Sequence, residues 1–378
     1  MKLIHLSDLH LGKRVNGFSM LDDQATILEQ ILAVIDDEAP DAVLIAGDVY
    51  DRTTPPAEAV RLFDDFLVKL SARAVRVIVI SGNHDSAERL SFGARLMAGS
   101  GVTLAPVYDG TLQPVTLTDA HGEVRIWPLP FLRRAQVQRY FPETELKNET
   151  DAIAAVIGSM DIDSTQRNVL VAHQFVTGAA TCDSEELQVG TADGVDVNVF
   201  APFDYVALGH LHGAQRVGRE TVRYCGTPLK YSFSEKDHIK SVTVAELGAK
   251  GEVLVRAVPL TPRHDLRELR GTYDALTLRA NYEHTATDDY LSIVLTDEQD
   301  VPDALMKLRV IYPNIMQLRY DNTRTRAEAV IEGAGIVPRR SALELFEDFY
   351  ALQNGQDMTK EQRDFAALLL QEIREAEA

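Results

Sequence analysis

The chain has few cysteines and no long apolar run. Its two cysteines, Cys182 and Cys225, are far apart in the 378 residues and form no CxxC pair. A disulfide framework is therefore not expected, and both side chains should be buried or free thiols. The first residues, KLIHLSD, form only a short strand-like run, and no stretch has the length of a signal sequence or a membrane span. We expect a soluble, cytoplasmic protein without membrane contact.

Basic residues are also in deficit, since 38 Lys and Arg stand against 57 Asp and Glu and give a formal net charge of −19. Such a charge disfavours tight, autonomous binding to nucleic acid, which usually needs a basic face. It does not exclude DNA, because bound divalent ions would place positive charge where a phosphate must lie. No nucleotide-binding loop of the GxxxxGK[ST] kind is present, so any dependence on ATP must come from a partner.

The length exceeds the range in which one hydrophobic core usually keeps growing, so two or three domains are expected. Short apolar runs at 3–8, 42–48 and 75–82 are separated by stretches of helical periodicity at about 20–38 and 56–72. This alternation predicts a sheet with parallel strands covered by helices. Strand-rich sequence continues to about residue 262 and predicts a second sheet packed on the first. The expected fold class is an α/β sandwich.

The segment from Thr261 to His264 marks a domain boundary. We expect a core domain at 1–264, a small α+β capping domain at 265–338 and a helical segment at 339–378. The last segment contains two acidic runs with an apolar stripe, separated by Asn354-Gly355. It is typical of an interaction hairpin that docks on a partner, although folding back on its own domain is an alternative.

Polar residues follow five of the predicted strands directly. The motifs are Asp8-Leu9-His10, Gly47-Asp48, Gly82-Asn83-His84-Asp85, Ala172-His173 and Gly209-His210-Leu211-His212. Ligands bind at the carboxyl ends of strands in open α/β sheets, so these side chains should meet at one edge. Each motif alone is weak evidence, because a single histidine is more often a core or surface residue. The five remaining histidines, His5, His121, His238, His264 and His284, have no such context.

The combination of imidazole, carboxylate and amide groups suits a pair of divalent cations such as Mn²⁺, Fe or Zn²⁺ better than Ca²⁺. We assign Asp48 as a bridge between two ions, with a hydroxide between them as the nucleophile. One ion would take Asp8, His10, Asp48 and His212, and the other would take Asp48, Asn83, His173 and His210. His84 is expected to be catalytic, either stabilising the developing charge or protonating the leaving oxygen, with Asp85 hydrogen-bonded to its imidazole.

The ordered motifs D-x-H, GD, GNHD, a lone His and GH-x-H resemble the signature of the calcineurin-like metallophosphoesterases. That superfamily includes nucleases, protein phosphatases, nucleotidases and cyclic-nucleotide phosphodiesterases. SDLHLGK, GDVYDRTTPP, SGNHDS, ALGHLHGAQ and RYCGTPLKYSFSE further resemble the bacterial SbcD nucleases, from residue 1 to about 335. One departure is Leu9, where many relatives have Trp.

The SbcD resemblance implies a Mn²⁺-dependent nuclease that degrades double-stranded DNA ends and cleaves single-stranded or hairpin DNA, in recombination, replication and repair. It also implies a heterotetramer of a homodimer with an SbcC-type ATPase, which residues 341–378 would bind. Exposed apolar residues at the homodimer face would be Phe63, Phe66, Leu90, Phe92 and Leu96, although ordinary core packing is an alternative for each of them. Candidates for DNA phosphate contacts are Lys13, Arg14, Arg52, Arg89, Arg133, Arg134 and Arg139.

Two other functions stay open. A two-metal phosphoprotein phosphatase or another phosphodiesterase is the first, because GDVYDR approaches the second motif of protein phosphatases. Those phosphatases usually carry GNHE where this chain has GNHD, and they would leave the capping unit unexplained. The second is a non-catalytic scaffold of an ATPase complex, which would have no need of His84.

Overall fold

The computed structural model describes residues 1–185 and 194–323, and beyond them residues 325, 343, 346, 347, 350, 358–360, 362, 363, 365, 366 and 369. Contacts divide the chain into two compact units, one of residues 1–295 with 301–319 and one of residues 296–300 with 320–378. The domain boundaries expected at residues 264 and 338 stay predictions. Most of the expected partner-binding segment, 341–378, lies outside the described residues.

The first unit is built on two six-stranded sheets. The first has the order β14-β13-β1-β4-β5-β6, and β1, β4, β5 and β6 run parallel to one another. Its strands are β1 (Lys2–Leu6), β4 (Ala42–Ala46), β5 (Arg76–Ile80), β6 (Val102–Leu104), β13 (Ser241–Leu247) and β14 (Val253–Pro259). The three parallel strands expected at the amino end are confirmed. Each ends two residues earlier than predicted, because the chain leaves the sheet there.

The second sheet has the order β11-β12-β10-β9-β8-β7, with β8, β9, β10 and β12 parallel. Its strands are β7 (Val115–Asp119), β8 (Gly122–Leu129), β9 (Arg167–His173), β10 (Tyr205–Gly209), β11 (Gln215–Val217) and β12 (Arg219–Tyr224). Not every strand after residue 100 belongs to it. β13 pairs antiparallel with β1, and β6 pairs with β5, so β6, β13 and β14 widen the first sheet instead.

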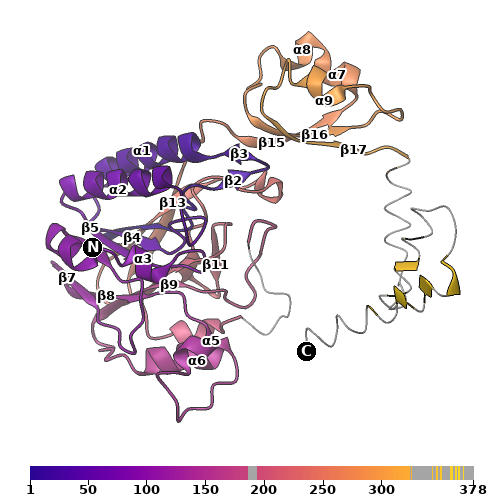
Figure 1. The fold of residues 1–378 in the computed structure, drawn as a ribbon. Helices are drawn as coiled ribbons and strands as arrows, with labels where there is room; N and C mark the ends of the chain where they lie inside the picture. The colour runs from indigo at the N-terminus through magenta and orange to yellow at the C-terminus, as the bar shows by residue number, and fades with distance from the viewer. Residues whose placement is uncertain are drawn as a thin grey trace. The chain divides into compact units, whose positions relative to one another are not determined.

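The two sheets stack face to face, and helices cover both outer faces (Figure 1). Leu3, Leu44 and Ile78 of the first sheet pack against Val169 and Ala207 of the second, and all are fully buried. Alternate residues of the same strands turn to the helices, which is why these strands are apolar at most positions on both faces. The predicted two-sheet α/β sandwich is confirmed.

Helices α1 (Leu21–Glu38) and α2 (Ala57–Ala72) cover the first sheet, and α5 (Arg134–Val137) and α6 (Glu149–Gly158) cover the second (Figure 1). In α2 the buried residues Phe63, Phe66 and Leu70 recur at helical spacing, and they face the core. The expectation that Phe63 and Phe66 are exposed at a homodimer face is therefore wrong, since they are 3% and 2% exposed. The shorter helices are α3 (Ala87–Leu90), α4 (Ala94–Met97) and three 3₁₀ turns at Ala98–Ser100, Val197–Phe200 and Phe233–Glu235.

Two smaller sheets complete the first unit. A hairpin of β2 (Arg14–Val15) and β3 (Phe18–Ser19) turns at Asn16-Gly17, which both have positive φ. A three-stranded sheet of β15 (Leu266–Gly271), β16 (Tyr290–Leu295) and β17 (Ile315–Tyr320) carries α7 (Tyr273–Thr277), α8 (Arg279–Tyr282) and α9 (Ala304–Leu308). The small α+β element expected after residue 264 is thus present, with three strands and three short helices among the described residues.

Among the described residues, no helix combines the length and the apolar character that crossing a membrane requires. Both cysteines are free, and Cys225 is buried, as the sequence predicts.

Candidate metal centre

The five motifs predicted to meet at one sheet edge do so. Asp8 and His10 follow β1, Asp48 follows β4, Asn83 follows β5, and His173 ends β9. Backbone hydrogen bonds tie the first two segments together, because Asp8 N–H donates to the Gly47 carbonyl and His10 N–H donates to the Asp48 carbonyl, both at 3.0 Å. His210 and His212 follow β10 on the second sheet, and His210 N–H donates to the Asp8 carboxylate at 3.1 Å. The edge is therefore shared by both sheets.

The backbone at this edge is strained. Asp8, His10, Asp48 and His210 have φ values of 51°, 45°, 47° and 108°, in the left-handed region that L-residues other than glycine seldom occupy. Such conformations persist where the surrounding structure imposes them, and they are concentrated at functional sites. They turn the side chains out of the strand direction and into one buried cluster.

A first group of donor atoms comes from Asp8, His10 and His212, all of which are buried. One ligand atom from each lies within 4.8 Å of the others. The Nε2 atoms of His10 and His212 are 3.2 Å apart. Burial lowers the pKa of His10 well below its ordinary value, so this imidazole is neutral at pH 7 and has a lone pair to donate.

A second group is centred on Asn83. Its Oδ1 lies 3.0 Å from Nε2 of His173 and 2.9 Å from Nδ1 of His210. His173 donates from Nδ1 to the Ala46 carbonyl at 2.8 Å, which leaves its Nε2 facing the other donor atoms. Burial, with the neighbouring His173, lowers the pKa of His210 to about 3 and keeps that ring neutral.

Asp48 lies between the two groups. Its Oδ2 is 3.8 Å from Nε2 of His10 and 3.3 Å from Nε2 of His173. Burial alone would raise the pKa of Asp48, but the charge and hydrogen bond of His173 lower it, so the carboxylate is ionised. The same pairing overcomes the effect of burial on His173 and raises the pKa of that imidazole to about 9.

These residues fit divalent cations. Carboxylate oxygens, an amide oxygen and imidazole nitrogens converge in a buried region. Most of these atoms are hydrogen-bond acceptors, and few N–H or O–H groups lie among them to donate. Nδ1 of His10 is buried without a hydrogen-bond partner among the described residues. Mixed nitrogen and oxygen ligands suit first-row transition metals, and two such ions sharing a carboxylate can polarise a phosphoester and activate water.

The expected pairing of Asp85 with His84 is wrong. The Asp85 carboxylate accepts hydrogen bonds from the backbone N–H groups of Val49, Tyr50 and Gly82, at 2.9 to 3.1 Å. The imidazole of His84 instead contacts the Asp51 carbonyl through Nδ1 at 3.0 Å. Asp85 thus holds together the loops that carry Asp48 and Asn83, and it does not touch the ring of His84. His84 itself lies beside His10, with ring centroids 4.8 Å apart.

Several residues around His212 were missed by the sequence reasoning. Ser184, Glu185, Glu235 and Lys240 contact its side chain, its backbone or one another. Ser184 and Glu185 belong to none of the five strand-end motifs, so no local pattern marks them. Glu235 lies within the motif RYCGTPLKYSFSE but has no metal-ligand spacing that would distinguish it.

The basic residues considered for DNA contact differ in how exposed they are and in whether they already have a partner within the chain. Lys13 is paired with Asp51 at 2.6 Å, and Arg134 donates to the Leu146 carbonyl at 3.0 Å. Arg52 is 77% exposed and lies 3.6 Å from Asp51. Arg89 donates to Thr54 at 3.0 Å, Arg14 donates to the Gly17 carbonyl, and Arg133 lies over the ring of Phe131. Arg139 is exposed.

Comparison with known proteins agrees with this site. A family profile described as calcineurin-like phosphoesterase matches residues 1–214, and one described as type 5 capsule protein repressor C-terminal domain matches residues 262–354. The SbcD subunit of the nuclease SbcCD from Staphylococcus epidermidis is 31% identical over 384 residues, which covers 100% of both chains. Its counterpart from Staphylococcus saprophyticus is 34% identical over 323 residues and 84% of each chain.

A solved structure, TT1561 of Thermus thermophilus, aligns with 68% of this chain and 98% of its own at 11% identity. Its TM-score of 0.38 is too low to support any argument. The chain belongs to the calcineurin-like phosphoesterases, hydrolases of phosphate esters, and within them to the family of the SbcD subunit of the nuclease SbcCD.

Proposed function

We propose that this chain is a Mn²⁺-dependent DNA nuclease that hydrolyses phosphodiesters with a metal-activated hydroxide. The observation that supports this most directly is the position of Asp48, a buried carboxylate between two groups of donor atoms. Two-metal phosphoesterases need such a shared ligand, because both ions must approach the same phosphate. The names of its relatives support DNA as the substrate.

In this proposal Asp8, His10, Asp48 and His212 would hold one ion, and Asp48, Asn83, His173 and His210 would hold the other. The bound ions would supply a hydroxide nucleophile and neutralise the charge of the phosphate. His84 then acts as the group that stabilises the developing charge or protonates the leaving oxygen. Its Nδ1 is held by the Asp51 carbonyl, which leaves Nε2 for the substrate. Asp85 has no part in that proton transfer. Its carboxylate instead holds the loops of Asp48 and Asn83 together by accepting backbone hydrogen bonds.

The proposal includes partners. Residues 341–378 would bind an SbcC-type ATPase, and the complex would work in the cytoplasm on DNA ends in recombination, replication and repair. Deleting these residues should spare basal hydrolysis of DNA and abolish stimulation by the ATPase. Loss of basal hydrolysis in a folded deletion variant would contradict this assignment.

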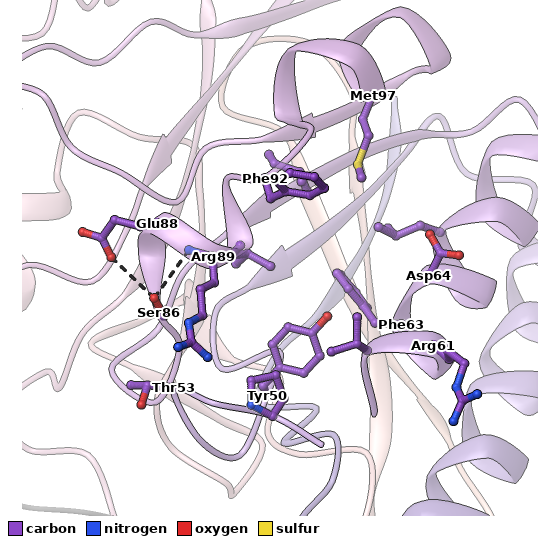
Figure 2. Close-up of a pocket in the computed structure, with 15 residues that line it drawn as sticks. Tyr50, Thr53, Arg61, Phe63, Asp64, Ser86, Glu88, Arg89, Phe92 and Met97 are labelled. Carbon is purple, nitrogen blue, oxygen red and sulfur yellow. Dashed lines mark hydrogen bonds between the residues drawn. The ribbon is translucent and has the colours of Figure 1, made fainter. Parts of the chain in front are cut away.

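A second copy of the chain would pack on the face around α3 and α4. Of the residues expected there, Leu90 is buried at 6% exposure, and only Phe92 and Leu96 are exposed, at 84% and 85%. Phe92 lines a pocket of about 770 Å³ with Val60, Phe63 and Met97 (Figure 2). An exposed aromatic residue beside an apolar pocket is typical of an interface that buries it.

The test is incubation of the chain with Mn²⁺ and end-labelled hairpin DNA, beside a phosphoserine peptide. Cleavage of the DNA, with loss of activity in His84→Ala, is the expected result. Cleavage of the peptide alone would favour a phosphoprotein phosphatase. Absence of both activities in a protein that binds Mn²⁺ would favour a scaffold.

A further inference from the structure

We propose that Ser184 and Glu235 form a hydrogen-bonded relay that fixes the imidazole of His212 in the Nδ1–H tautomer and so prepares its Nε2 to hold a metal ion. This inference deepens the proposed function and rests on it for the role of Nε2. Ser184 and Glu235 are positioning residues, since they act through His212 and contact no other member of the candidate metal centre by their side chains.

The relay is a continuous chain of short contacts. Nδ1 of His212 lies 2.7 Å from Oγ of Ser184, and that hydroxyl lies 2.6 Å from Oε1 of Glu235. Nδ1 of His212 and Oε1 of Glu235 are themselves 3.6 Å apart, which is too long for a direct hydrogen bond. The hydroxyl therefore fills the gap between ring and carboxylate.

Glu235 is held as an anion by its surroundings. Its side chain is completely buried, and Oε2 accepts a hydrogen bond from Nζ of Lys240 at 2.5 Å. Nζ of Lys240 also donates to Oγ1 of Thr227 at 2.7 Å and to the His212 carbonyl at 2.9 Å. All three donors of the ammonium are thus used, so Lys240 is a charged, fully satisfied partner of the Glu235 carboxylate.

The charge of Glu235 fixes the direction of each proton. An ionised carboxylate can only accept, so the one proton of the Ser184 hydroxyl must point to Oε1. Oγ of Ser184 is then an acceptor toward His212, and Nδ1 must carry a hydrogen. In a neutral imidazole the other nitrogen, Nε2, is unprotonated, and Nε2 is the atom that faces His10 at 3.2 Å. An outer carboxylate that sets the tautomer of a metal-binding histidine is a recurrent arrangement in metalloproteins.

The loop that supplies Ser184 is fastened on both sides of it. Oε1 of Glu185 accepts from the backbone N–H of His212 at 2.6 Å. The backbone N–H of Asp183 donates to Oγ of Ser234 at 3.0 Å, next to Glu235 in sequence. Ser234 anchors the same loop but does not touch the imidazole. It therefore offers a matched control for any effect that comes from the loop alone.

The experiment compares wild type with Ser184→Ala, Ser184→Thr and Ser234→Ala, all in the full-length protein. Isothermal titration calorimetry with MnCl₂ measures the affinity of the two ions. Ser184→Ala should weaken one of the two by about 10- to 100-fold, while Ser184→Thr restores it and Ser234→Ala binds as wild type does. The relay is overturned if Ser184→Ala binds both ions normally, if the threonine variant fails to recover, or if Ser234→Ala loses as much affinity.

A second readout keeps the relay separate from the proposed function. ¹⁵N chemical shifts of histidine in the metal-free protein, assigned with His212→Asn, report which ring nitrogen carries the proton. Wild type should show the Nδ1–H form of His212, and Ser184→Ala should show a mixture. An Nε2–H form in wild type would refute the relay. If wild type binds no Mn²⁺ yet shows the Nδ1–H form, the proposed function fails and the relay stands.

Discussion

Gly82 lies directly against Asp48. A Cβ atom built on Gly82 would be 2.1 Å from Oδ1 and 2.5 Å from the backbone nitrogen of Asp48, both far inside van der Waals contact. Neither atom can move away freely, because Oδ1 accepts a hydrogen bond from His84 N–H at 2.9 Å and Asp48 already has a positive φ. A glycine is therefore required at position 82 because any side chain there would collide with the Asp48 carboxylate, and not because of the backbone conformation of Gly82 itself.

Gly82→Ala should displace the Asp48 carboxylate and weaken the binding of both ions. Because misplacement of a catalytic group by about 1 Å can cost about 100-fold in rate, kcat for a phosphodiester substrate should fall by about that factor. Calorimetric titration with MnCl₂ and steady-state kinetics measure the two effects. Gly99→Ala is the control, since a Cβ there would meet no heavy atom within 4 Å. Normal Mn²⁺ affinity in Gly82→Ala would show that Asp48 is not a shared ligand.

His84→Ala should keep both ions and lose turnover. His84 lies beside His10 and Asp48, with one ligand atom of each within 4.8 Å of the others, but it is assigned to catalysis and not to either ion. A general acid–base group typically contributes about 10²- to 10⁴-fold to the rate. Metal content by mass spectrometry and kcat in the presence of saturating Mn²⁺ separate the two properties. Loss of one or both ions from the purified variant would make His84 a ligand and not a catalytic group.

Asp85→Asn should act on stability first. The carboxylate accepts three backbone hydrogen bonds, from Val49, Tyr50 and Gly82, and an amide nitrogen in its place would face a donor. Leaving one buried donor unsatisfied costs about 1–3 kcal/mol, which should appear as a lower Tm of the metal-free protein. The pH dependence of kcat should keep its shape, because Asp85 does not contact the His84 ring. A shift of that profile without a change in Tm would restore Asp85 to the proton chemistry.

The positions of the proposed metal ligands can be predicted from the sequence more completely than the residues that hydrogen-bond to those ligands. Each proposed ligand ends a largely apolar strand or lies within four residues after one, so the meeting of Asp8, Asp48 and His173 at one edge could be predicted. The partners of those ligands have no such pattern. Asp85 is adjacent to His84 in sequence, but its carboxylate turns toward Val49 and Tyr50, because three unpaired N–H groups attract it more strongly than one imidazole.

Long-range pairing explains the other differences. β13 joins the first sheet beside β1, although most of the core sequence separates them, and no local feature of either strand indicates this. The spacing of Phe63 and Phe66 indicates an apolar stripe on α2 but not what covers it. The first sheet covers that stripe, which is why both residues are buried. In the same way Ser184 and Glu235 meet through tertiary structure across 51 residues, so their relay to His212 has no signature in the sequence.

Metal binding should release protons. In the metal-free protein burial lowers the pKa of His173, but the Asp48 carboxylate outweighs it and raises that pKa to about 9, so the ring is protonated at pH 7. A metal can bind only the neutral ring, so Mn²⁺ affinity should rise as the pH increases toward 9 and level off above it. Titrations at pH 7.5 in two buffers of different ionisation enthalpy should give about one proton released per protein. No release, together with a pH-independent affinity, would exclude His173 as a ligand.

Phe92→Glu with Leu96→Glu should dissociate the proposed homodimer. Both side chains are exposed, at 84% and 85%, so the folded chain loses little by the change, whereas an interface would have to bury two carboxylates. Loss of a central aromatic contact costs about 2 kcal/mol or more, so the dissociation constant should rise at least roughly 30-fold. Met306→Glu, at a residue 68% exposed on α9, is the matched control. Light scattering coupled to size exclusion measures the mass, and a wild-type chain that stays monomeric at high concentration would rule out this face as a self-association surface.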